Sequence, residues 1–297
     1  MAYPFILCDV FAARPFAGNP LAVFLDAEEI AETTMASLAK EFGWSEITFV
    51  TGGATMPRVR IWTPGGELPF AGHPTVGTAV VLASTGHIEQ GWSTLQLGIG
   101  PVAVEVALAP LGGRATMTQR TPDFGRVVED RVRLAEALGL EEEELVPDLP
   151  AQVVSTGLPH FLVPVRSLEA LGRARPEPDL LPALTEGLGV RWAYVFCTDT
   201  PGTAAAARAR LIGVGGEDPA TGSAAGPLGA YLVHYGVHRA GAMDVEQGVE
   251  MGRPSRIVVD VPVEGGEIGS VRVAGEVHIW GRGELVDLPA PSATVDV

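Results

Sequence analysis

The sequence predicts an α+β fold built from two similar lobes, and three observations support this prediction. The chain has 297 residues, which corresponds to two domains of ordinary size. Glycine and proline, with 37 and 24 residues, make up about a fifth of the chain, as expected for many short strands joined by turns. Each half also contains strands, a glycine-rich turn and then one strongly apolar helical run, an order that indicates internal duplication.

The first half is predicted to contain short strands and one amphipathic helix. We expect Asp26 to cap this helix and Gly43 to end it, because apolar residues recur between them at spacings of three and four. Apolar runs and alternation of apolar with polar residues predict the strands. These strands cover residues 4–10, 20–25, 45–51, 58–63, 94–99, 102–108 and 114–118.

One strongly apolar helix is expected near the centre of each lobe. In the first half, Pro74 opens a run over residues 75–84 that has almost no polar face. In the second half, residues 223–235 form a similar run that ends at Gly236. Because such helices have no face suited to water, both should be buried on nearly all sides.

The middle of the chain is predicted to connect the lobes. Residues 120–150 contain a short helix, an acidic run and then Pro147 and Pro150, and residues 213–222 form a glycine-rich leader to the second apolar helix. The predicted lobes are residues 1–121 with a C-terminal return of 282–297, and residues 122–281. The second half is expected to contain a helix at 180–188 and strands at 152–155, 160–165, 193–198, 205–212, 257–261, 270–273 and 277–280.

Charge and composition exclude several classes of function. With 20 Lys and Arg against 36 Asp and Glu, the formal net charge is −16, which disfavours binding to nucleic acid and to anionic membranes. Lys40 is the single lysine, so phosphate loops and Schiff-base chemistry have one possible donor on an ordinary amphipathic run. The expected partner is a small molecule.

The sequence also indicates where the protein works. Residues 1–16 have no basic leader and are interpreted as a strand, and no apolar run is long enough for a membrane span. Cys8 and Cys197 lie in strand-like runs and are expected to be buried thiols that do not act as nucleophiles. We expect a soluble, cytoplasmic protein.

Several familiar motifs fail in their context. His234 and His238 have the helical spacing of zinc ligands, but Gly236 interrupts the helix between them, and we predict no metal. Residues 98–103 have dinucleotide-loop spacing but lead into a strand, where such a site needs a helix.

The starts of the two apolar helices are candidate binding sites. Gly72 and His73 open the first, and Gly222 and Ser223 open the second. A helix start offers unpaired backbone N–H groups and partial positive charge, which attract a carboxylate. Alternatively, these glycines only let a helix pack closely against strands.

Two side chains at these starts are candidate site residues. His73 lies at a positive helix end that lowers its pKa and favours the neutral imidazole. Asp218 adds a carboxylate five residues before Ser223. Its alternative role is that of a turn or cap residue ahead of Pro219.

Glu46 is the candidate acid/base group. It opens a strand beside Trp44 and Phe49, an apolar setting that raises the pKa of a carboxyl group and suits it to proton transfer. The alternative is an exposed position at a strand edge. Glu67, within a turn-rich stretch, is assigned a structural role.

Ordered motifs along nearly the whole chain resemble those of the PhzF family, the phenazine-biosynthesis-like isomerases and epimerases. The matching segments are residues 9–11, 15–23, 45–49, 67–75, 155–160, 217–224, 247–248 and 252–255. One departure is Ile47, where the family often has threonine beside the glutamate.

The resemblance implies a diaminopimelate-epimerase-like fold: two pseudo-symmetric lobes, each a curved sheet or barrel around one central helix, with the site in the cleft between them. It implies that Glu46 is the general acid/base and that His73, Asp218 and Ser223 surround the substrate and its carboxylate. It also implies isomerisation of a dihydro-hydroxyanthranilate-like substrate without a cofactor, and it favours a homodimer.

Three hypotheses follow from these residues and motifs. The first is a cofactor-independent isomerase in which Glu46 moves the proton and the helix starts hold the carboxylate. The second is an epimerase or racemase of an amino-acid-like substrate. The third is a catalytically silent protein that binds small acids.

Overall fold

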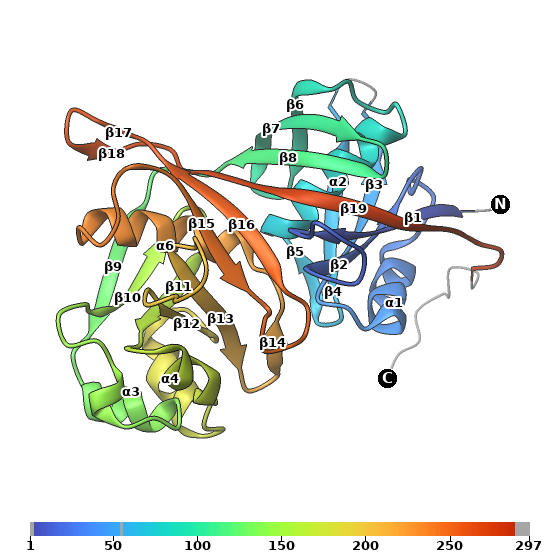
Figure 1. Cartoon of the computed structure of the whole chain (residues 1–297). Coiled ribbons are helices and arrows are strands. Elements are labelled where there is room, and N and C mark those ends of the chain that lie inside the picture. Colours follow the sequence, from blue (N-terminus) through green and yellow to red (C-terminus); the bar gives the residue numbers. More distant parts are fainter. Residues whose placement is uncertain (1–2, 54–55, 289–297) are drawn as a thin grey trace. The chain divides into compact units, whose positions relative to one another are not determined.

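A computed structural model describes residues 3–53 and 56–288 of the chain (Figure 1). The chain divides into two compact units. Unit 1 contains the described residues up to Met117 and those from Gly275 onward, and unit 2 runs from Thr118 to Ala274. Of the expected C-terminal return, residues 289–297 lie outside the described residues.

Unit 1 is a closed ring of strands around a buried helix. The pairings run from β19 to β1, β2, β3, β4, β6, β7 and β8 and back to β19. The elements before β19 are β1 (Tyr3–Val10), β2 (Asn19–Phe24), α1 (Glu32–Phe42), β3 (Ile47–Thr51), β4 (Arg58–Thr63), β5 (Gly66–Leu68), α2 (Gly72–Ser84), β6 (Gly91–Leu97), β7 (Gly100–Ala109) and β8 (Gly112–Thr118).

Helix α2 is the core of this ring, as its composition predicts. Every residue from Gly72 to Ala83 is buried, and the helix packs against β1, β2, β3 and β7. Gly77 is one reason for the close approach, since a Cβ there would lie 2.5 Å from the Leu21 side chain. The helix begins at Gly72, so Pro74 is its third residue and not its first.

Unit 2 repeats this plan around α6 (Gly222–His234). Its strands pair in the order β9, β10, β11, β12, β13, β15, β16 and β19, with the same parallel steps as in unit 1. Its elements are β9 (Asp123–Val128), α3 (Arg131–Ala137), η1 (Glu142–Glu144), β10 (Ala151–Ser155), β11 (Pro159–Pro164), α4 (Leu168–Arg173), α5 (Leu180–Thr185), η2 (Glu186–Leu188), β12 (Ala193–Cys197), β13 (Ala207–Gly213), β14 (Gly216–Asp218), β15 (Gly241–Gln247), β16 (Ser255–Val261), β17 (Val263–Glu264) and β18 (Glu267–Ile268).

The predicted α+β fold with duplicated halves is confirmed, but several elements differ from the prediction. Helix α1 begins at Glu32 after Ala31, so Asp26 does not cap it. The predicted crossing segment contains β9, which pairs with β10. The two short strands expected near the C-terminus are one strand, β19 (Arg272–Leu285), because the residues between them keep an extended backbone. Strands β5, β14 and β15 and helix α4 were not predicted.

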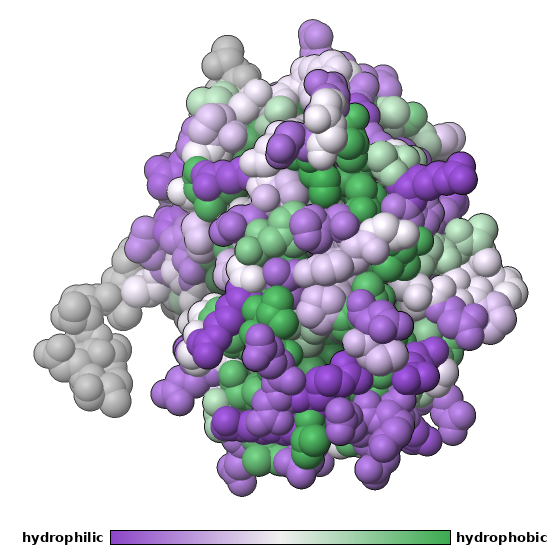
Figure 2. All heavy atoms as spheres, turned by 90° about the vertical axis from the view of Figure 1, so that its left-hand side faces the viewer, coloured by the Kyte–Doolittle hydropathy of each residue, from purple (hydrophilic) through white to green (hydrophobic). Residues whose placement is uncertain are grey.

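The surface is largely hydrophilic, and the helices are short. On the face drawn in Figure 2, hydrophilic side chains predominate and apolar ones lie among them. Within residues 3–53 and 56–288, no helix has the length and hydropathy needed to cross a membrane. The two most apolar helices, α2 and α6, have 13 residues each, against about 20 for a span.

Candidate functional site

Unit 1 places Glu46 beside His73. Glu46 lies immediately before β3, and His73 is the second residue of α2. Glu46 Oε2 is 3.7 Å from His73 Nε2, and the two side chains are 15% and 4% exposed. The alternative of an exposed strand edge is therefore wrong for Glu46.

A chain of hydrogen bonds orients the imidazole. The Ser45 hydroxyl donates to Asn19 Oδ1 at 3.0 Å, so the amide nitrogen of Asn19 faces His73 Nδ1, also at 3.0 Å. An amide nitrogen can only donate, so Nδ1 accepts and the neutral ring carries its proton on Nε2. Among the described residues, Nε2 makes no hydrogen bond. Its N–H is thus available to an acceptor near the Glu46 carboxyl group.

Burial keeps His73 neutral. It lowers the pKa of His73 to about 3, because transfer of an imidazolium from water to this site is costly. The distance of 3.7 Å to Glu46 is too long for a hydrogen bond, and the carboxylate does not outweigh that cost. The predicted direction of the shift is confirmed, but its main cause is burial and not the positive helix end.

The start of α2 also leaves backbone donors without side-chain caps. Ala71 precedes the helix and has no side-chain acceptor, so the first N–H groups, beginning at Gly72, have no cap from that residue. In unit 2, the Thr221 hydroxyl donates to the Asp218 carboxylate and does not cap α6. Both helix starts therefore keep the donors that an anion would use.

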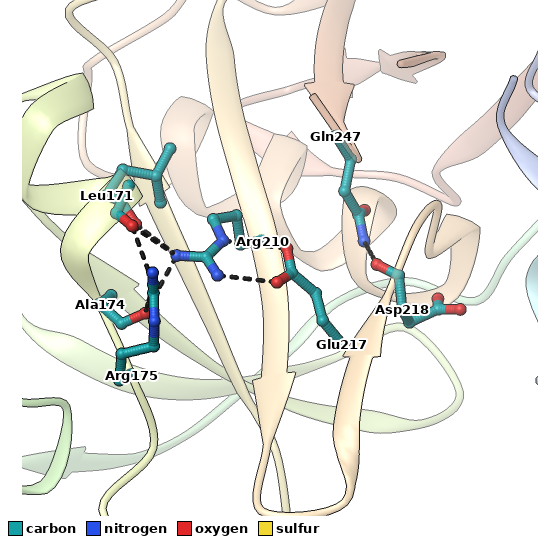
Figure 3. Close-up of polar contacts among 8 residues, drawn as sticks. Leu171, Ala174, Arg175, Arg210, Glu217, Asp218 and Gln247 are labelled. Atoms are coloured by element: carbon teal, nitrogen blue, oxygen red, sulfur yellow. Dashed lines mark hydrogen bonds and ion pairs between the residues drawn. The ribbon is translucent and has the colours of Figure 1, made fainter. Parts of the chain in front are cut away.

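Asp218 ends β14, and its neighbours form a polar network in unit 2. Figure 3 shows Gln247 reaching the backbone of Asp218, whose carbonyl oxygen accepts from Gln247 Nε2 at 2.7 Å. Since Asp218 also accepts the Thr221 hydroxyl, the turn role considered for it is present in the structure. This role leaves Asp218 adjacent to the start of α6.

Ser223, the second residue of α6, has a histidine partner. His160 Nε2 lies 3.1 Å from the Ser223 hydroxyl oxygen, and burial lowers the pKa of His160 to about 4. The carbonyl of Gly222 accepts from Gln119 Nε2 at 3.0 Å. A neutral imidazole on β11 and an amide from the residue after β8 thus fix the first turn of the helix.

A buried ion pair at the residue before Asp218 also supports β14. Arg210 donates to both carboxylate oxygens of Glu217 at 2.9 and 2.7 Å and to the carbonyls of Leu171 and Ala174 at 2.7 and 3.0 Å (Figure 3). The Arg210 side chain is 6% exposed. Because Glu217 precedes Asp218, this pair holds the strand that presents Asp218.

The structure thus assembles two groups of the predicted site residues. Glu46, His73 and Gly72 come together in unit 1, whereas Asp218, Gly222 and Ser223 share one segment of unit 2. Sequence reasoning did not single out the supporting residues. The signal for them lay in the motifs at residues 155–160 and 247–248, which contain His160 and Gln247 and had no assigned role.

The two cysteines agree with their prediction. Cys8 and Cys197 are buried free thiols, and burial raises the pKa of both. A thiol with a raised pKa is a poor nucleophile at neutral pH.

Comparison with known proteins decides the family. The model of the phenazine biosynthesis-like proteins matches residues 8–282. The chain belongs to that family. An uncharacterized isomerase of Mesorhizobium japonicum is 37% identical, with 95% of this chain and 98% of the relative covered. The trans-2,3-dihydro-3-hydroxyanthranilate isomerase of Pseudomonas chlororaphis is 33% identical, with 95% and 99% covered. Like these members of the family, the chain is an isomerase.

Solved structures of related proteins have the same fold as this chain. A predicted epimerase from Pseudomonas aeruginosa is 39% identical with a TM-score of 0.84, covering 96% of this chain and 99% of its own. A probable proline racemase from Agrobacterium radiobacter, 12% identical with a TM-score of 0.64, covers 96% and 93% and shares the fold alone. The epimerase-like α+β fold expected of the phenazine biosynthesis-like family is confirmed.

Proposed function

We propose that this isomerase moves a proton between two carbon atoms of a small carboxylic acid, without a cofactor. The observation that carries the proposal is the pair formed by Glu46 and a neutral His73 at the start of α2. A proton shift of this kind needs one acid/base group and a means of stabilising the negative charge that deprotonation leaves on the substrate.

Glu46 is the acid/base group in this proposal. Its partial burial limits competition from water, and its carboxyl group lies near the His73 N–H. A carboxylate that removes a proton from carbon becomes the acid that returns one to another carbon, so no net proton enters or leaves the protein. His73 contributes a hydrogen-bond donor and not a second base.

The helix starts provide the electrostatic part of the proposal. The N–H groups at Gly72 and Gly222 and the hydroxyl of Ser223 suit the carboxylate of a substrate and the negative charge that develops after deprotonation. Asp218 suits a positively charged group such as an ammonium. A substrate with the carboxylate and amino functions of dihydro-hydroxyanthranilate carries both kinds of group.

The test follows hydrogen at carbon. The purified protein, after dialysis against a chelator, is incubated with trans-2,3-dihydro-3-hydroxyanthranilate in deuterated buffer and followed by NMR. We expect a shifted double bond, with deuterium at the new C–H position to the extent that the proton on Glu46 exchanges with solvent before it returns to carbon. Absence of both product and exchange would overturn this assignment, and ligand binding with neither product nor exchange would favour the small-acid binding protein.

A second candidate is epimerisation, which the 39% identical predicted epimerase favours. Epimerisation returns the proton to the same carbon from the opposite face and therefore needs a donor on that face. Chiral chromatography of products from small α-amino acids and hydroxy acids separates this activity from double-bond isomerisation. The homodimer and the cytoplasmic location also stand as proposals, to be tested by light scattering and by cell fractionation.

A further inference from the structure

The two units share a frame of equivalent residues. In unit 1, β4 carries Arg60 and the hairpin strand β5 carries Glu67, which accepts from it at 2.8 and 2.6 Å. Arg210 and Glu217 hold the same register positions in unit 2, where β13 pairs with β14. The segments that follow lead directly into α2 and α6.

The shared frame extends to a close contact of glycine with proline. A Cβ on Gly98 would lie 2.7 Å from Pro69, and one on Gly248 would lie 2.5 Å from the Pro219 carbonyl oxygen. Each glycine directly follows the strand that runs parallel to β4 or β13. The backbone of this strand end therefore supports the helix leader in both units.

The units differ at three equivalent positions of this frame, in polarity at two of them and in side-chain size at the third. Where unit 1 has Leu97 and Ala71, unit 2 has Gln247 and Thr221, as the registers of the parallel strand pairs and the helix starts show. The third difference is Tyr194 in β12, which takes the register position of a buried threonine in β3. We call Tyr194, Gln247 and Thr221 the polar triad.

The polar triad is fully hydrogen-bonded. Gln247 Oε1 accepts from the Tyr194 hydroxyl and from the Thr221 backbone N–H, both at 3.0 Å. Gln247 Nε2 donates to the Asp218 carbonyl at 2.7 Å and to the Thr221 hydroxyl oxygen at 2.9 Å. The amide thus uses both lone pairs and both hydrogens, and Figure 3 shows it aimed at the strand end that carries Asp218.

The members of this triad are buried, and burial of a polar group is costly unless hydrogen bonds replace its contacts with water. Gln247 and Tyr194 are completely buried, and a buried polar group must recover its lost hydration through hydrogen bonds. The frame itself does not require polarity here, since unit 1 fills the equivalent strand position with Leu97, which is 3% exposed. The triad therefore adds geometric definition to the segment from Asp218 to Thr221 and not core stability.

We propose that Gln247, oriented by Tyr194, is a positioning residue that holds Asp218 and the first turn of α6 in the geometry that binds substrate. This inference rests on the proposed function of Asp218, Gly222 and Ser223. It assigns a role to the motif at residues 247–248, and it predicts that loss of the triad weakens substrate binding more than it slows the chemical step.

The test replaces two members of the triad by apolar residues of similar size. The double variant Tyr194→Phe with Gln247→Leu removes the side-chain amide and the hydroxyl together, so that neither leaves the other without a partner. The matched control is Tyr235→Phe with Gln152→Leu, because the Tyr235 hydroxyl donates to Gln152 at 2.8 Å in the same unit. Gln152 is 6% exposed, and its amide donates to Gly125 and not to the α6 leader.

Two measurements decide the outcome. Amide hydrogen exchange is measured for peptides covering residues 216–226, and KM and kcat are measured with trans-2,3-dihydro-3-hydroxyanthranilate. We expect the triad variant to exchange at least tenfold faster in this segment and to raise KM at least tenfold, with kcat within fivefold of wild type. The control variant should leave both the segment and KM unchanged.

The two proposals fail in different ways. If exchange in the segment and KM both match those of the wild-type protein, the triad does not position the helix start and the inference is overturned. The same conclusion follows if kcat falls with KM unchanged, since that result indicates only fewer folded molecules. If the wild-type protein itself shows no turnover, the proposed function fails, and exchange in residues 216–226 alone decides the positioning role.

Discussion

Replacement of Glu46 by glutamine tests the proton-transfer proposal most directly. The amide has nearly the size and shape of the carboxyl group, so it fits the site 3.7 Å from His73 Nε2. It cannot take up a proton from carbon at neutral pH. Loss of one general acid/base group lowers a rate about 10²- to 10⁴-fold, or ~3 to ~5 kcal/mol in activation free energy.

The structure indicates that the loss lies near the upper end of that range. His73 is the partner of Glu46 in this pair. Its pKa of about 3 leaves roughly one molecule in 10⁴ with a protonated imidazole at pH 7. It can neither replace Glu46 as a base of suitable strength nor supply the acid. We therefore expect kcat to fall about 10⁴-fold for E46Q.

The assay is turnover of trans-2,3-dihydro-3-hydroxyanthranilate in deuterated buffer, with Glu67→Gln as the control. Glu67 belongs to the same unit and pairs with Arg60 near the surface, so its loss should leave kcat within threefold of wild type. A folded E46Q protein whose kcat stays within threefold of wild type would refute the assignment of Glu46.

Three further predictions concern stability. Because burial lowers the pKa of His73 and of His160 to about 3 and about 4, the unfolded chain binds more protons below pH 6.5, so stability is fully present above that pH and is lost as pH falls. Urea unfolding should show a loss of about 1 kcal/mol for each histidine between pH 7 and pH 5.5, and H73N should reduce that loss. R210A should cost about 3 to 5 kcal/mol, whereas R60A, at the more exposed equivalent pair, should cost about 1 kcal/mol or less; equal losses would contradict the role of burial. Gly77→Ala should cost about 1 to 3 kcal/mol by urea unfolding, because its methyl group would overlap buried side chains of β1 and β2, and an unchanged midpoint would exclude this close packing.

Apolar composition predicted the two central helices, because a helical run without a polar face must be buried. Residues 75–84 and 223–235 contain almost nothing that water favours, so any compact fold must enclose them. Their exact starts depend on backbone geometry that composition does not encode. Helix α2 includes Gly72 and His73 ahead of Pro74, so it begins two residues before the predicted start and His73 lies on the helix itself.

The missed strands have a common physical cause. Strands β5 and β14 are three residues long and lie in glycine-rich turns, and they form only because β4 and β13 supply hydrogen-bond partners. Strand β9 is mostly exposed and exists through its pairing with β10. Asp26 failed as a helix cap because its backbone takes a left-handed conformation, with φ of 51°, five residues before the cap position.

The candidate site was only partly predictable for a related reason. Glu46, His73, Asp218 and Ser223 carry chemistry visible in their residue types, and the helix starts gave them a location. The hydrogen bond from Asn19 that sets the His73 tautomer and the contact of His160 with Ser223 join residues 54 and 63 positions apart. No local pattern reports such pairs, since only the completed sheet brings the strands together.

The duplicated frame separates structural from functional residues within one chain. Positions that both units keep, such as the Arg–Glu pairs on β4 with β5 and on β13 with β14, serve the fold that each unit must form on the same plan. At positions where the units differ, the common fold does not determine the residue. His73 stands where unit 2 has Ser223, and Leu97 stands where unit 2 has Gln247. A polar residue that is buried at only one of two equivalent positions has a desolvation cost that the common fold does not require. We therefore expect residues with a role in substrate binding or catalysis at these differences.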